Sequence, residues 1–104
     1  MNLLWTRRAR DDLVEIALYI ARDKPVAALN WIDWLEQRAR KISDGPMNYR
    51  IVPEFQRADI REMITGNYRT VFKVEADRVV ILTVFEGHKE LDLDPDEAPD
   101  LDAE

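Results

Sequence analysis

The stretch from Ile60 to Glu75, IREMITGNYRTVFKVE, decides the predicted fold because its pattern is that of a β-hairpin. In its first half, alternate residues fall on opposite faces of a strand: Ile60, Glu62 and Ile64 on one face, and Arg61, Met63 and Thr65 on the other. Gly66 and Asn67 suit a two-residue turn, after which a second strand returns from Tyr68. The C-terminal half of the chain is therefore predicted to form an antiparallel sheet.

Three further strands are predicted around this hairpin. Residues 78–85 are almost continuously apolar, which indicates a central strand. Residues 2–5 form a short apolar strand at the start of the chain. Residues 50–55 could extend the sheet, but Pro53 has no N–H to donate and limits this segment to an edge or irregular strand.

Two helices are predicted between the first strand and the hairpin. Residues 8–22 follow Thr6, a suitable N-cap, and carry apolar residues at helical spacing: Leu13, Ile16, Ala17 and Ile20. Pro25 separates them from residues 26–42, where the apolar positions step by three and four: Ala28, Ile32, Leu35, Ala39 and Ile42. So short a connection predicts an antiparallel helix hairpin. The order of elements predicts an α+β fold: an N-terminal strand, the helix hairpin, and then a three- to four-stranded, mainly antiparallel sheet. The helix pair is expected on one face of the sheet, with the other face open to solvent or a partner.

The composition excludes several kinds of site. The 104-residue chain has no cysteine and one histidine, His88, so neither a disulfide, a thiolate metal site nor a histidine-rich zinc site is expected. We expect no metal and no cofactor. No apolar run approaches the roughly 20 residues of a membrane span, and the opening residues lack the apolar block of a signal peptide. These features predict a cytoplasmic protein.

The net charge of −6 is divided unevenly along the chain. Residues 92–104 hold seven of the 21 acidic residues and none of the 15 basic ones, which leaves residues 1–91 at about +1. Neither part has the strong basic field of a protein that finds nucleic acid by charge alone. We therefore predict a domain over residues 1–91 and an acidic, mobile tail over residues 92–104. The tail is interpreted as a solubilising end, with intramolecular shielding of a basic sheet face or competition with a nucleic-acid-bound target as alternatives.

An ordered set of residues resembles the ParE-like toxins of the RelE/ParE superfamily, from type II toxin–antitoxin systems. It runs through Trp5, Thr6, Ala9, Asp12 and Leu13, then Tyr19 to Ala21, Asp23, Pro25, Ala27 and Ala28, then Pro46, Arg50, Val52 to Glu54, Arg61, Glu62, Tyr68 and Arg69, and ends with Val79 to His88. The resemblance covers Leu4 to Leu91. It departs from the family pattern where Tyr49 precedes Arg50 in place of glycine, where Lys89-Glu90-Leu91 follows His88 in place of a nearby arginine, and in the acidic tail.

The resemblance implies one of two activities. RelE-like members cut messenger RNA on ribosomes, whereas ParE-like members act on DNA gyrase without catalysis of their own. Metal-free RNA cleavage needs cations for the phosphorane and groups that move two protons. Arg61 and Arg69 are the candidate cations, with His88, Glu54 or Glu86 as acid or base. Because a late tyrosine and a dense basic cluster are missing, we predict no catalytic residues and an inhibitor of DNA gyrase. The alternatives are a metal-independent endoribonuclease that uses Arg61, Arg69 and His88, and a member that still binds an antitoxin but is no longer toxic.

The expected partners are a cognate antitoxin and DNA gyrase, with no membrane and no direct sequence-specific nucleic acid; a homodimer is left open. The residues expected to contact the target are Arg50, Arg61, Tyr68 and Arg69, with Arg61 and Arg69 sharing an exposed sheet face. The residues expected to contact the antitoxin are Trp31, Trp34 and Arg38 on the second predicted helix. Large aromatic side chains suit such a role because they bury much area at little entropic cost.

Overall fold

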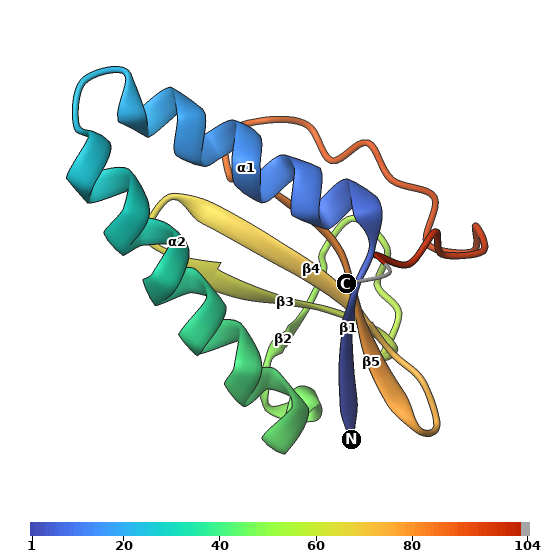
Figure 1. Ribbon diagram of the computed structural model, residues 1–104. Coiled ribbons are helices and arrows are strands. Elements are labelled where there is room, and N and C mark those ends of the chain that lie inside the picture. The colour runs from blue at the N-terminus through green and yellow to red at the C-terminus, as the bar shows by residue number, and fades with distance from the viewer. Residues whose placement is uncertain (103–104) are drawn as a thin grey trace.

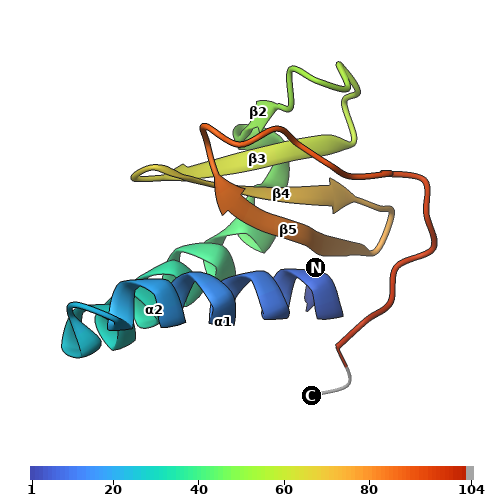
Figure 2. The same cartoon turned by 90° about the horizontal axis from the view of Figure 1, so that it is seen from above.

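The structure, a computed structural model, describes residues 1–102, so the last two positions of the predicted tail lie outside it. The elements follow in the order β1 (Asn2–Trp5), α1 (Arg7–Ala21), α2 (Pro25–Arg40), the 3-10 turns η1 (Lys41–Asp44) and η2 (Pro46–Asn48), β2 (Arg50–Ile51), β3 (Ile60–Thr65), β4 (Tyr68–Val74) and β5 (Arg78–Glu86). Both helices lie on one side of the sheet (Figures 1 and 2). The predicted α+β fold is confirmed.

The sheet has five strands in the order β1-β5-β4-β3-β2. β1 runs parallel to β5, and all other neighbours are antiparallel. The predicted β3–β4 hairpin turns at Gly66, whose φ of 59° lies in the left-handed region that glycine adopts without steric cost. β5 is central, as its apolar sequence predicts, with β1 and β4 on its two sides.

The helix boundaries follow the capping signals. The Thr6 side chain accepts a hydrogen bond from the Ala9 N–H at 3.1 Å and begins α1, and Pro25 occupies the first turn of α2. Leu35 and Ala39 are fully buried against the sheet. The second helix is shorter than predicted because Ile42, also fully buried, lies in the following 3-10 turn.

The strand predicted over residues 50–55 is reduced to Arg50–Ile51. Pro53 cannot donate to a ladder, and the N–H groups of Phe55 and Gln56 both turn back to the Val52 carbonyl at 3.2 and 3.0 Å. The chain thus leaves the sheet in a turn and carries Glu54 away from the edge, toward the sheet face opposite the helices.

The sheet buries apolar side chains on both faces. One core lies beneath the helix pair and includes Leu13, Leu35, Met63 and Phe72. A second, smaller core on the opposite face includes Val71, Val80 and Leu82, with the partly buried residues Phe55, Phe85, Leu91, Leu93 and Leu101 packed against it.

The prediction that this second face stays open is wrong. Figure 2 shows the chain after β5 crossing the sheet on the side away from the helices and descending to the N-terminal end of α1. Leu93 and Leu101 contact the second core and Pro95 is buried, so the acidic segment has a defined place as far as Asp102. The division at residue 91 and the mobility of the tail remain predictions. Among the described residues, no helix is long and apolar enough to cross a membrane.

Candidate functional site

A network of charged side chains joins β2, β3, β4 and the loop after β2 on the second sheet face. Its centre is Glu62 of β3, whose side chain is fully buried. Arg69 of β4 donates from Nε to Glu62 Oε1 at 2.6 Å and from its two terminal nitrogens to both oxygens of Glu54, at 2.8 and 2.7 Å. Arg50 of β2 also pairs with Glu62. Arg69 is thus held by two carboxylates, one of them in bidentate geometry.

This arrangement stabilises the charged forms of its members. Hydrogen bonds from Arg69 lower the pKa of Glu54, although its partial burial acts in the opposite sense. The hydrogen bonds that Arg69 donates to Glu54, and next the one that it donates to Glu62, raise the pKa of Arg69 further above its usual range. The guanidinium carbon also lies 4.9 Å from the centre of the Phe85 ring. Arg69 is therefore a neutralised internal cation, with only 9% of its surface exposed.

Arg61 lies on the other face of the sheet. It is paired with Phe72 across the hairpin, whereas Arg69 is paired with Ile64, and residues 61 and 64 point to opposite faces. Arg61 donates to the backbone carbonyls of Ala58 at 2.9 Å, Tyr49 at 2.9 Å and Met47 at 3.3 Å. The prediction that Arg61 and Arg69 share an exposed face is wrong, and Arg61 holds the segment before β2 in place.

A shallow hollow beside the β3–β4 turn brings four of the predicted residues together. Arg50, Tyr68, Arg69 and His88 line it with Ile64, Gly66, Asn67 and Gly87, and its volume is about 350 Å³. The Gly87 N–H donates to the Asn67 carbonyl at 2.7 Å, and a Cβ at Gly87 would lie 3.3 Å from that oxygen. This close approach sets the position of the neighbouring His88 beside the hairpin.

The groups in the hollow do not form an acid–base pair. His88 is exposed and has no hydrogen bond or ion pair within residues 1–102. Of the two carboxylates predicted as candidates for proton transfer, Glu54 is occupied by Arg69 and Glu86 does not line the hollow. Metal-free cleavage requires a base, an acid and free cations at one reacting phosphate. Of the two arginines that line the hollow, Arg50, with 57% of its side chain exposed, is the one with access to solvent.

The three residues predicted to contact an antitoxin differ in their surroundings. Trp31 packs edge-on against Tyr68, with ring centres 5.1 Å apart, and belongs to the border of the main core. Trp34 is 47% exposed. Arg38 donates to Thr65 Oγ1 at 3.2 Å and to the Ile64 carbonyl at 3.3 Å, and so ties α2 to the β3–β4 hairpin. Of the three, Trp34 offers the most surface to a partner relative to its structural contacts.

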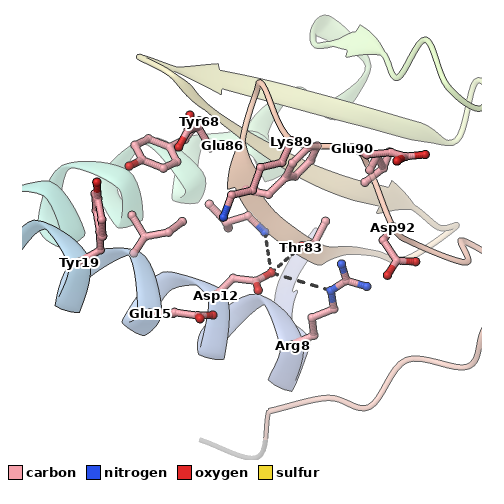
Figure 3. Close-up of a pocket in the computed structure, with 14 residues that line it drawn as sticks. Arg8, Asp12, Glu15, Tyr19, Tyr68, Thr83, Glu86, Lys89, Glu90 and Asp92 are labelled. Carbon is pink, nitrogen blue, oxygen red and sulfur yellow. Dashed lines mark hydrogen bonds and ion pairs between the residues drawn. The ribbon is translucent and has the colours of Figure 1, made fainter.

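A second cavity of about 350 Å³ lies between α1, the end of β5 and the segment that follows it. Figure 3 shows Tyr19 and Tyr68 at one end and Arg8 and Asp92 at the other. The carboxylates that line it are Asp12, Glu15, Glu86, Glu90 and Asp92, against the two cations Arg8 and Lys89. This excess of negative charge disfavours phosphate groups.

Asp12 lines this cavity and attaches α1 to β5. Its Oδ2 accepts hydrogen bonds from Thr83 Oγ1 at 2.5 Å and from the Val84 N–H at 3.1 Å, which fixes α1 on β5. Burial, and then the negative charge of Glu86, raises the pKa of Tyr68.

The cavity between α1 and the end of β5 was not predicted because α1 and residues 86–92 are far apart in sequence. The only local signal was Tyr19, an aromatic residue outside the apolar stripe of its helix. No group of three or more histidine, cysteine or acidic side chains in residues 1–102 is placed to hold a metal ion.

The fold and these sites define a class, a small α+β protein with a helix hairpin packed on one face of a mainly antiparallel sheet. Residues 3–91 match the family described as the ParE toxin of the type II toxin–antitoxin system parDE. The chain therefore belongs to the ParE toxin family. It is the toxin of a type II toxin–antitoxin system, and this class implies an antitoxin partner.

A solved structure supports the fold independently. The chain is similar to a protein from the chromosomal ParDE toxin–antitoxin system of P. aeruginosa, with a TM-score of 0.72 and 20% sequence identity. The similarity covers 83% of this chain and 95% of that one. No curated protein sequence matches the chain.

Proposed function

We propose that this ParE-family toxin arrests growth in the cytoplasm by inhibiting DNA gyrase and that a cognate antitoxin neutralises it. Membership of the ParE family supports a gyrase target over a ribosomal one. The observation that carries the proposal is the position of Arg69. Both sides of its guanidinium are bound by carboxylates of the same chain, so it has little capacity left for an RNA phosphate.

The other candidate groups support the same conclusion. Arg61 is directed at three backbone carbonyls, and His88 stands alone at the rim of the hollow. A nuclease would need these groups around one phosphodiester, where each proton transfer contributes about 10²–10⁴-fold to the rate. An inhibitor needs only a complementary surface. The hollow beside the hairpin turn, with Arg50 and Tyr68, is the surface we assign to the target.

The antitoxin surface is assigned to the helix hairpin. Several large apolar side chains on the two helices are exposed there, among them Val14, Leu18, Val26, Leu29 and Trp34. Single exposed apolar residues are ordinary, but this number on one helix pair is typical of a surface that a partner covers. An amphipathic segment of the antitoxin could bury them by the usual helix-in-groove mode.

Expression in bacteria with and without the antitoxin tests this function. Labelled thymidine and labelled methionine report DNA synthesis and translation in the same culture. We expect DNA synthesis to stop first, with filamentous cells, and co-expressed antitoxin to restore growth. Translation that stops first, with messenger RNA cut in codon register on ribosomes, would support the RelE-type ribonuclease instead.

A further inference from the structure

We propose that residues 92–102 are an intramolecular ligand, and that the surface beneath them is a docking site for an extended acidic peptide segment. The site consists of the free edge of β1, the second sheet face and four basic side chains: Arg7, Arg10, Arg57 and Lys73. Its occupant is the chain's own C-terminal segment. The inference is independent of the cellular target.

The segment binds through its backbone at the edge of β1. Leu101 forms an antiparallel bridge with Thr6, the residue that follows this strand. The Arg7 N–H donates to the Asp100 carbonyl at 2.8 Å, and the Asp102 N–H donates to the Trp5 carbonyl at 2.9 Å. β1 uses its other edge to pair with β5. The segment thus begins a sixth strand at an edge that would otherwise expose its backbone groups.

Apolar contacts anchor the middle of the segment. Leu93 and Leu101 pack against the core formed by Val71, Val80 and Leu82. Pro95 is buried, and its carbonyl accepts a hydrogen bond from Lys73 Nζ at 3.2 Å. Removal of the segment would therefore expose apolar surface on the second sheet face.

Charge complementarity gives the site its preference for acidic segments. Asp96 pairs with Arg57 at 2.8 Å, Asp100 with Arg7 at 3.4 Å, and Asp102 with Arg10 at 3.5 Å. The pairs of Asp96 and Asp100 are largely exposed, so each contributes little and is sensitive to salt. Weak, screened contacts of this kind favour a ligand that can be released.

The part of the chain that matches the family ends where this ligand begins. The family match stops at residue 91, and the docked segment starts at residue 92. The site therefore lies on the family domain and the ligand on the additional segment. As a tethered ligand, the segment has an effective concentration on the order of 1 mM, enough to exclude a competitor of the same intrinsic affinity at micromolar concentration.

Binding in trans tests the site directly. The experiment uses a chain that ends at Leu91, a synthetic peptide of residues 92–102, and calorimetry at low salt. We expect one peptide to bind per truncated chain and none to bind the full chain. Affinity should fall at least about tenfold at 1 M salt, where charges are screened beyond roughly 3 Å. A Leu101→Asp peptide should fail to bind, whereas a Glu97→Gln peptide should bind normally, because the Glu97 side chain has no partner in residues 1–102. A folded truncated chain that does not bind the peptide would overturn the proposal.

Hydrogen exchange in the full chain keeps the proposal testable if the truncated chain does not fold. The amides of Arg7 and Asp102 should exchange much more slowly than in an unstructured peptide, because both donate to the opposite strand. Leu101→Asp should release both amides while leaving the β3–β4 amides protected, and Glu97→Gln should release neither. An Asp102 amide that exchanges freely in the unmodified chain would show that the segment does not dock.

Discussion

Arg69 Nε lies 2.6 Å from Glu62 Oε1, and the Glu62 side chain is completely excluded from solvent. Removing one member of a buried ion pair leaves the other charged and without its partner. We predict that Arg69→Met destabilises the fold by about 3 kcal/mol, at the low end of the range for such changes because Arg50 still pairs with Glu62. Urea unfolding measures this, with Arg40→Met on the surface of α2 as the control. Equal stability of the two variants would show that the network contributes nothing to folding.

This relationship also limits how Arg69 can be used to test target binding. An Arg69→Glu protein would place a third carboxylate beside Glu54 and Glu62, so lost toxicity would report unfolding. Arg50→Gln is the better probe of the hollow, because more than half of the Arg50 side chain is exposed.

Acid should weaken the fold through Glu54. The pKa of Glu54 is lowered in the folded state, chiefly by the hydrogen bonds from Arg69. The contribution of Glu54 to stability is therefore complete above its pKa in the unfolded chain, and it is lost as the pH falls through its lower pKa in the folded chain. We expect the free energy of unfolding to decline below about pH 4.3, and less steeply in Glu54→Gln, which has no proton to take up. Urea titrations across this range measure the slopes, with Glu97→Gln as the control. Parallel slopes for Glu54→Gln and the unmodified chain would remove Glu54 from the acid response.

Leu35 tests the packing of the helix pair on the sheet. It is completely buried in the main core, so Leu35→Ala should leave a cavity and cost roughly 2–5 kcal/mol. Leu29→Ala removes the same atoms from the same helix at a position that is 68% exposed, and should change stability by less than about 0.5 kcal/mol. Thermal and urea unfolding of the two variants compare them. An unchanged midpoint for Leu35→Ala would contradict the position of α2.

Trp34 tests the antitoxin surface. Because it is half exposed, Trp34→Ala should weaken the antitoxin complex by about 2 kcal/mol or more while leaving the unfolding midpoint nearly unchanged. Trp31→Ala should lower the midpoint as well, because the Trp31 ring packs against Tyr68 and the core. Titration calorimetry and unfolding of each variant separate the two effects. Antitoxin affinity that survives Trp34→Ala would place the groove elsewhere.

Most of the fold could be predicted because its signals are local. Thr6 and Pro25 mark the helix starts, and the alternation from Ile60 to Thr65 around the Gly66-Asn67 turn defines the central hairpin. The difference at residues 52–55 is also local in origin, because Pro53 disfavours a strand and the N–H groups of Phe55 and Gln56 turn back to the Val52 carbonyl instead of continuing the ladder.

The candidate site was harder to predict because it depends on register and on long-range contacts. The turn at Gly66-Asn67 pairs Thr65 with Tyr68, and counting back from that pair places Arg61 and Arg69 on opposite faces. The position of the turn in the sequence is therefore enough to predict that the two arginines lie on opposite faces. By contrast, nothing local shows that Glu54 reaches Arg69, or that Leu93 and Leu101 dock on the second core. An acidic segment with two prolines has the composition of a solvated tail, and only the tertiary structure places it.

The proposed inhibition of DNA gyrase is tested most directly by a supercoiling assay with purified toxin, gyrase, ATP and relaxed plasmid. A parallel assay supplies the toxin with messenger RNA bound to ribosomes. We predict that the toxin blocks supercoiling, that the antitoxin restores it, and that His88→Gln inhibits as well as the unmodified chain, while the messenger RNA stays intact. Unaffected gyrase, together with codon-positioned cuts in the messenger RNA that His88→Gln abolishes, would contradict it.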